Sequence, residues 1–380
     1  MLSRPEDSMR LRLAVGGIAL LVVTAIVVPC LLQAGEVSQP SGYALLDPIR
    51  SGNLTVFPVV ASKSYDTGQF LTLDEGIRSG EVVVTEAGQA QGLIRRRPDT
   101  RPVPRPTGEG EVNRLVLVNN SKRPLLLLAG EIVTGGKQDR VIGKDRIVPA
   151  ESDPVDLSVF CVEPGRWTAA SGKPDFGTAR EGVSALFANP AVRAKAMGAK
   201  NQQQVWDEVR KSQHAMATAE AVVVAGAAPE VETQSSYARV MGNTEVAKQV
   251  DIVAKPIQQN YESVIRQLRD KNAVGVVVAV NGEVVWADLF ASTQLLQKYW
   301  PKLVRSYATE AVVTRAKNAE ASTRQAQKFL DNLQGRHETA DTEPGVYRQS
   351  EISGNGFKVF ELTSLLPKTG FPVHVAKMAE

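Results

Sequence analysis

Residues 273–290 read AVGVVVAVNGEVVWADLF. The apolar, β-branched residues on both sides of Asn281-Gly282 are typical of two strands. Asn-Gly is the strongest short hairpin signal, because both residues tolerate the positive φ of a type I′ turn. The stretch therefore predicts an antiparallel hairpin.

The chain before this hairpin begins β-rich. Short apolar or alternating runs bounded by turn residues predict strands at 53–61, 81–87, 112–119, 123–133 and 155–163. Residues 71–80 predict a short helix that Gly80 ends. Residues 95–111 are rich in proline and polar residues, which predicts an exposed loop.

From about residue 189 the composition favours helix. Helical segments are expected at 188–217, at 243–270 with a break near Pro256, and at 292–317 with Pro301 kinking or restarting the helix. The small residues of 221–236 predict a mobile loop. Ser322 and Gln325 have capping-box spacing, and Gly335 is the expected stop of that helix. Strands are expected again at 345–353, 357–363 and 371–378.

This order of elements predicts an α+β fold with mostly antiparallel sheets, because the short connections leave little room for parallel crossovers. We expect a leader at 1–35, a β-rich part at 43–167 and an α+β part at 168–380, the last two packed as one domain.

The leader is a candidate membrane anchor. Residues 13–32 are twenty residues without a charge, enough to cross a bilayer as a helix. Arg4, Arg10 and Arg12 precede this run and predict that the body of the protein lies outside the cytoplasm. An uncleaved anchor and a cleaved signal peptide are both open. A lipid-modified Cys30 is disfavoured by Pro29, since such sites need a small, flexible residue there.

The charge of the chain argues against nucleic-acid binding, and its cysteine content argues against a disulfide framework. The 380 residues carry a formal net charge of +3, of which the leader holds +1. The charges of the remaining chain are nearly balanced, so it has no strong positive electrostatic field that would attract nucleic acid. Cys161 is the one cysteine after the leader, so no internal disulfide is expected.

Common catalytic and metal motifs are missing from the sequence. His214, His337 and His374 show no zinc spacing, so no metal site is predicted, and each is expected to be structural or exposed to solvent. Neither a G-x-S-x-G elbow nor a G-x-G-x-x-G loop occurs. No cofactor is indicated.

One glycine-rich stretch, LLLLAGEIVTGGKQDRVIGKD at 125–145, concentrates charges. It fails as a phosphate-binding loop, because Glu131 stands where the first glycine belongs and Gln138 replaces the Ser or Thr. Gly135 and Gly136 instead predict a turn with positive φ between two strands.

This stretch, with FCVEPGRW at 160–167, VGVVVAVNGEVVWADLF at 274–290 and WPKLVRSYATEA at 300–311, resembles the ARG-and-rhodanese-phosphatase-superfamily-associated protein domain family. The resemblance covers residues 43–378. It implies a link to NAD or ADP-ribose metabolism, through association with ADP-ribosylglycohydrolase and rhodanese-phosphatase proteins, but no established activity or catalytic residue.

Two functions are open. The first is binding or processing of a small anionic or nucleotide-related ligand, with an anion nest at the glycine turn and acid-base or cation-binding carboxylates beside it. The second is a non-catalytic interaction module anchored in the membrane. Cys161 is expected to be a buried small residue. The candidate ligand-binding residues are Glu131, Gly135, Gly136, Lys137, Gln138, Asp139, Arg140, Glu163, Arg166 and Trp167.

Overall fold

The predicted hairpin lies at the centre of the protein in the computed structural model. Strands β13 (Asn272–Val280) and β14 (Glu283–Phe290) pair antiparallel across Asn281 and Gly282, whose φ angles are 53° and 79°. Both predicted positive φ angles are confirmed. The structure describes residues 42–86, 114–164, 176–177, 186–269 and 271–380.

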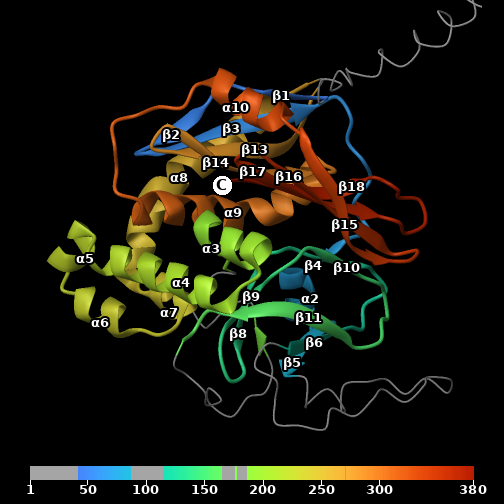
Figure 1. Cartoon of the computed structure of the whole chain (residues 1–380), viewed down its shortest axis with the longest axis horizontal. Coiled ribbons are helices and arrows are strands. Elements are labelled where there is room, and N and C mark those ends of the chain that lie inside the picture. The colour runs from blue at the N-terminus through green and yellow to red at the C-terminus, as the bar shows by residue number, and fades with distance from the viewer. Residues whose placement is uncertain (1–41, 87–113, 165–175, 178–185, 270) are drawn as a thin grey trace, which may run out of the picture. The chain divides into compact units, whose positions relative to one another are not determined.

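The hairpin belongs to an antiparallel sheet of nine strands in the described residues, in the order β1-β3-β13-β14-β18-β17-β16-β15, with β2 paired to β3 (Figure 1). Strands from both ends of the described chain thus meet at the hairpin. The other strands are β1 Tyr43–Leu45, β2 Ile49–Ser51, β3 Leu54–Ala61, β15 Gly335–Glu343, β16 Tyr347–Gly354, β17 Phe357–Ser364 and β18 Pro372–Ala379.

Both faces of β13 are covered. Val276 and Val278 pack in one core with α8 (Thr244–Gln267) and α9 (Thr293–Val313). Val277 and Ala279 pack on the opposite face with α10 (Thr323–Asp331). A strand buried on both faces needs apolar residues at every position, which explains the unbroken valine run.

Two smaller sheets complete the β structure. One has the order β12-β8-β9-β11-β6-β5, and the other has the order β10-β7-β4, in which β4 and β7 are parallel. The predicted α+β class with mostly antiparallel sheets is confirmed. The elements are β4 Leu71–Thr72, α2 Leu73–Ser79, β5 Val82–Glu86, β6 Arg114–Asn119, β7 Leu125–Leu127, β8 Ile132–Gly135, β9 Arg140–Ile142, β10 Arg146–Val148, β11 Val155–Cys161 and β12 Phe176–Gly177.

A group of helices lies at the left of the view in Figure 1, beside the sheets. The loop predicted at 221–236 is wrong, because most of it forms α5 and α6. Its alanines favour helix, and Pro229 lies in the first turn of α6, where a missing amide hydrogen is tolerated. The elements are α3 Pro190–Ala194, the π-helix η2 Lys195–Ala199, α4 Gln202–Ala217, α5 Glu220–Val224, α6 Ala228–Thr233 and α7 Tyr237–Gly242.

Local signals for helix ends gave mixed results. The capping box of Ser322 with Gln325 and the left-handed Gly80 that ends α2 are confirmed. The break at Pro256 is wrong, since α8 continues through it. Helix α9 likewise continues through Pro301. Packing of both helices on the sheet outweighs the loss of one helical hydrogen bond each.

Gly335 does not end α10, which stops at Asp331. Gly335 instead begins β15, where a Cβ would meet the Ser353 carbonyl oxygen at 2.5 Å.

Residues 42–380 form one compact unit. In the described part of this unit, no helix is both long enough and apolar enough to span a bilayer. The predicted leader at 1–35 and the predicted loop at 95–111 lie outside the described residues.

Gly275 on β13 is a close-approach point between strands. A Cβ there would lie 2.3 Å from the backbone oxygen of Asp288. Because the obstacle is backbone, we expect Gly275→Ala to lower the free energy of unfolding by about 1–3 kcal/mol. Urea denaturation of the full chain measures this. Gly42→Ala is the control, since no atom lies within 4 Å of its added Cβ, and an equal loss in both variants would contradict the prediction.

Candidate functional site

The predicted glycine turn joins β8 to β9. Gly135 has φ 135° and Gly136 has φ 46°, so both positive φ angles are confirmed. A Cβ at Gly136 would lie 2.3 Å from the ring of Phe176. Backbone conformation and close packing therefore both require glycine at this position.

Backbone N–H groups of the turn hold carboxylates of the protein itself. Gly135 N–H donates to Asp139 Oδ1 at 3.1 Å, and Lys137 N–H donates to Glu86 Oε1 at 3.1 Å. Glu86 comes from the end of β5, another strand of the same six-stranded sheet. Two carboxylates of the protein itself therefore accept hydrogen bonds from the turn backbone.

Four of the predicted site residues meet in a buried cluster behind the turn. Gln138 Nε2 donates to the Glu163 carbonyl at 3.0 Å, and Asp139 N–H donates to Glu163 Oε2 at 3.1 Å. Asp139 also accepts a hydrogen bond from Ser236 at 2.5 Å. Arg140 Nη1 lies 3.4 Å from the carbonyl of Asp139. We call Gln138, Asp139, Arg140, Cys161 and Glu163 the turn cluster.

Arg140 is the cation of this cluster and is buried. Desolvation lowers the pKa of Arg140, although the carboxylates of Glu86, Asp139 and Glu163 oppose this change. A guanidinium keeps its charge despite such a shift. The turn cluster together with Glu86 thus holds one cation against three carboxylates.

Cys161 is fully buried and its thiol donates to Gln138 Oε1 at 2.9 Å. Desolvation raises the pKa of the thiol. Because the thiolate is the reactive form, the geometry favours an inert, structural cysteine. Its backbone is fixed by two hydrogen bonds to the Gln202 side chain, at 2.8 and 2.9 Å.

Glu131 lies apart from the turn cluster. Its carboxylate accepts from Leu128 N–H at 2.7 Å and from Lys302 Nζ on α9 at 2.5 Å. Lys302 also donates to Asp74 at 2.6 Å. Burial raises the pKa of Glu131, and its nearest cation, Lys302, opposes that change. Glu131 therefore joins the small sheets to α9.

A second buried network was missed by the sequence. His374 on β18 contacts Asp145 Oδ2 through Nδ1 at 2.5 Å and Asp288 Oδ1 through Nε2 at 3.2 Å. Arg193 on α3 holds Asp288 with two hydrogen bonds of 2.8 and 2.9 Å. Tyr307 on α9 also donates to Asp288. We call these five residues the core ion network.

The core ion network is arranged for stability. The carboxylates of Asp145 and Asp288 raise the pKa of His374 to about 9, and Arg193 with His374 holds the pKa of Asp288 well below its usual range. A protonated His374 then balances the charges, with two cations and two anions. Both imidazole N–H groups are engaged, so His374 has no lone pair with which to act as a base.

The one local signal for this network is Asp288 within VVWADLF, a charge in an otherwise apolar strand. Its partners lie 19 to 143 positions away along the chain, and no spacing rule connects them. His374 is buried and structural, as one of the two expected roles.

Two further observations concern metal binding and the remaining predicted site residues. Over the ranges that the structure describes, no group of three or more His, Cys, Asp or Glu side chains is arranged to hold a metal ion. Arg166 and Trp167, predicted as ligand-binding residues, lie outside the described ranges.

The raised pKa of His374 predicts a pH-dependent stability. A folded-state pKa of about 9 against an ordinary 6.5 contributes about 3 kcal/mol, fully present below pH 6.5 and lost as the pH rises to 9. We expect the free energy of unfolding of wild type to exceed that of His374→Asn at pH 6, and the difference to shrink by pH 9. Denaturant unfolding at both values measures this, and a constant difference would contradict it.

Of three comparisons with known proteins, one gave a match. Comparison with curated proteins and with solved structures gave no significant match. The sequence model of the ARG and Rhodanese-Phosphatase-superfamily-associated Protein domain matches residues 42–376, which is nearly the whole described unit. The chain therefore belongs to the ARG and Rhodanese-Phosphatase-superfamily-associated Protein domain family.

Proposed function

We propose that this protein is an extracytoplasmic domain, anchored by its N-terminal apolar segment, that binds a small anionic ligand at the glycine turn. The candidate residues are those predicted from the sequence around Gly135 and Gly136. The proposal assigns binding to this site and no catalytic step.

The observation that carries the proposal is the carboxylate of Glu86 on the N–H of Lys137. In this contact an N–H group of the turn binds a carboxylate oxygen of the protein itself, which supports recognition of an oxyanion. Glu86 is partly exposed, unlike the buried Asp139. In the proposal, a ligand phosphate or carboxylate takes the position of Glu86, and Glu86 swings away.

Charge supports this exchange. With Glu86 displaced, Lys137 and the buried Arg140 balance the buried Asp139 and Glu163, so an incoming anion meets a site with no net charge. With Glu86 in place the site carries an additional negative charge, which repels the ligand. Glu86 is thus an internal competitor for the site.

The family supports a phosphorylated ligand. Its name associates it with ARG and rhodanese-phosphatase proteins. The resemblance seen in the sequence implies ADP-ribose or NAD chemistry, whose compounds carry the phosphates that a backbone nest recognises.

Removing the competitor tests the site. We expect Glu86→Gln to tighten binding of pyrophosphate and ADP-ribose about fivefold, since a like charge at the site is removed, and Lys137→Ala to weaken it by a similar factor. Isothermal titration calorimetry measures both. Glu81→Gln is the matched control, an exposed glutamate directly before the same strand. Affinity that is equal in wild type, Glu86→Gln and Lys137→Ala would contradict the assignment.

The anchor is tested separately. We expect the full chain, expressed in a bacterium, to stay with the membrane after alkaline extraction, and its body to be digested when protease is added to spheroplasts. A chain lacking residues 1–35 should be soluble and protected. Protection of the full chain from protease would contradict the proposed location, and an intact-mass measurement separates the anchor from a cleaved signal peptide.

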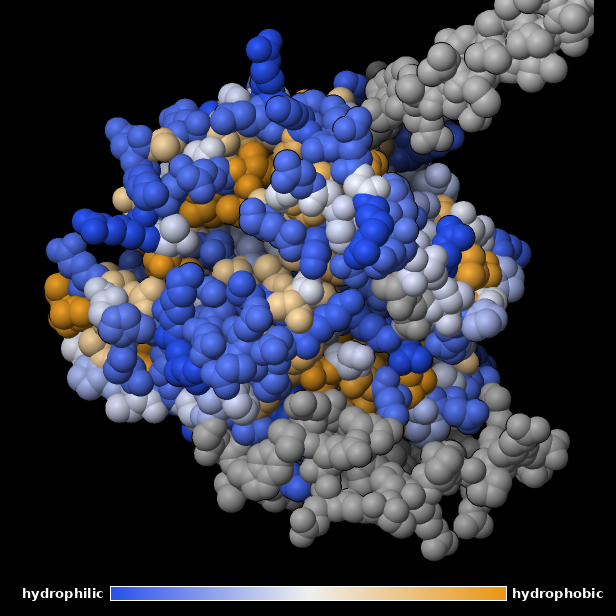
Figure 2. All heavy atoms as spheres, in the orientation of Figure 1, coloured by the Kyte–Doolittle hydropathy of each residue, from blue (hydrophilic) through white to orange (hydrophobic). Residues whose placement is uncertain are grey.

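The second candidate function is a non-catalytic, membrane-anchored interaction module. It is favoured by the apolar surface of α5, where Val223 and Val224 are 52% and 81% exposed. Figure 2 shows apolar atoms gathered at the left edge of the molecule, over α5. This function predicts that changes at Glu86 and Lys137 leave anion binding unchanged, so the same titrations separate the two candidates.

A further inference from the structure

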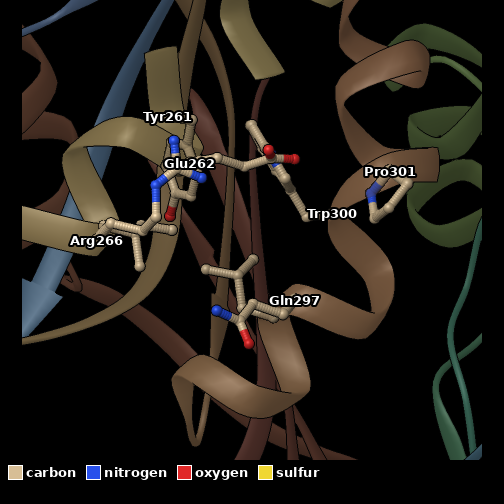
Figure 3. Close-up of a pocket in the computed structure, with 8 residues that line it drawn as sticks. Tyr261, Glu262, Arg266, Gln297, Trp300 and Pro301 are labelled. Carbon is tan, nitrogen blue, oxygen red and sulfur yellow. The ribbon is translucent and has the colours of Figure 1, made fainter. Parts of the chain in front are cut away.

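Two polar side chains of the hollow between α8 and α9 are engaged within the protein (Figure 3). Tyr261 is fully buried, and its hydroxyl donates to the Gly275 carbonyl at 3.0 Å. Glu262 accepts a hydrogen bond from Gln258 at 3.0 Å. The hollow is therefore a gap in helix packing, and the open edge of the large sheet is the stronger candidate for an interaction.

Strand β15 is the last strand of the nine-stranded sheet. Among the described residues its one partner strand is β16, which pairs along one of its two edges. At the other edge, alternate N–H and C=O groups point away from the sheet. Such an edge is a template for pairing with a further strand.

A bulge limits the part of β15 that can pair regularly. The register with β16 is continuous over residues 335–339 and shifts between Thr339 and Asp341. A bulge interrupts the ladder and bends its strand. The regular part is therefore residues 335–339, which we call the β15 edge. All of its side chains are exposed, and His337 is its central residue.

One charge of each sign lies on one face of the β15 edge. Arg336 and Glu338 are two positions apart on the strand, so their side chains point to the same face. Arg336 Nε and Glu338 Oε1 lie 3.2 Å apart, and the two side chains are 74% and 52% exposed. Both charges are therefore open to a strand that is added at this edge.

Symmetry restricts how a second copy of the chain could pair here. Opposite residues of an antiparallel pair point to the same face, so a two-fold axis through the sheet must pass through one residue of each copy. An axis at Arg336 puts two arginines opposite each other, and an axis at Glu338 puts two glutamates opposite each other. An axis at His337 instead puts Arg336 of each copy opposite Glu338 of the other.

The axis at His337 also pairs the β15 edge with the whole of itself. Gly335 of each copy lies opposite Thr339 of the other, so the paired region ends where the bulge begins. Unlike charges directly across two strands stabilise the pair, and like charges destabilise it. So short a ladder buries much less area than a stable interface needs, and the pairing is therefore weak and reversible.

We propose that the β15 edge pairs antiparallel with the same edge of a second copy of this chain, about His337. The two large sheets then form one continuous sheet. Arg336 and Glu338 of both copies alternate in charge on one face, so backbone hydrogen bonds give the pairing and the charges select the partner. The proposal is independent of anion binding at the glycine turn.

Disulfide trapping tests the register. The purified full chain carries Cys30→Ala, so that the buried Cys161 is its remaining native cysteine. In a His337→Cys chain the two new cysteines are directly opposite, with Cα atoms about 4.5–5.5 Å apart, which suits a disulfide. Thr339→Cys is the control, because a four-residue offset separates the two copies of that position by about 13 Å.

We expect oxidation with copper phenanthroline to cross-link the His337→Cys chain at least about tenfold more than the Thr339→Cys chain, as measured on non-reducing gels. Equal yields in the two chains, or no covalent dimer of the His337→Cys chain, overturn the proposal.

Charge reversal in the His337→Cys chain tests recognition of the partner. Arg336→Glu puts like charges opposite each other and should lower the cross-linked yield about fivefold, and adding Glu338→Arg should restore it. Arg324→Glu is the matched control, an exposed arginine on α10 whose change should leave the yield as it was. A double variant that stays as low as Arg336→Glu alone, or an equal loss with Arg324→Glu, overturns the proposal.

Discussion

The buried ion pair between Arg193 and Asp288 is the interaction on which the arrangement of the fold depends. Asp288 lies on the central hairpin, and its carboxylate also binds His374 of β18 and Tyr307 of α9. Through His374 the network reaches Asp145, beside the small sheets. Removing any one charge would leave another buried without its partner, which is strongly destabilising. The network therefore fixes the positions of the large sheet, α3, α9 and the smaller sheets together.

The glycine turn shows how an anion-binding backbone can be built into a fold without an external ligand. Its N–H groups are satisfied by Asp139 and Glu86, so the turn is stable in this state. In both contacts the acceptor is a carboxylate oxygen, which is the kind of group that the proposed ligand would present. A buried carboxylate and a partly exposed one differ in how readily they leave, which is why Glu86 rather than Asp139 controls access in the proposed function.

The sequence by itself determined the local structure: the Asn281-Gly282 hairpin, the positive φ of Gly135 and Gly136, the caps at Ser322 and Gly80, and the α+β class. These depend on neighbours in the chain, so short patterns suffice. Only the tertiary structure decided that α8 and α9 pass through prolines. It also separated the charged residues that the sequence had predicted to form one site. Glu131 pairs with Lys302, whereas Asp139, Arg140 and Glu163 lie together behind the turn. The core ion network joins residues far apart in sequence, and long-range pairing of charges leaves no periodic signal because it is set by packing.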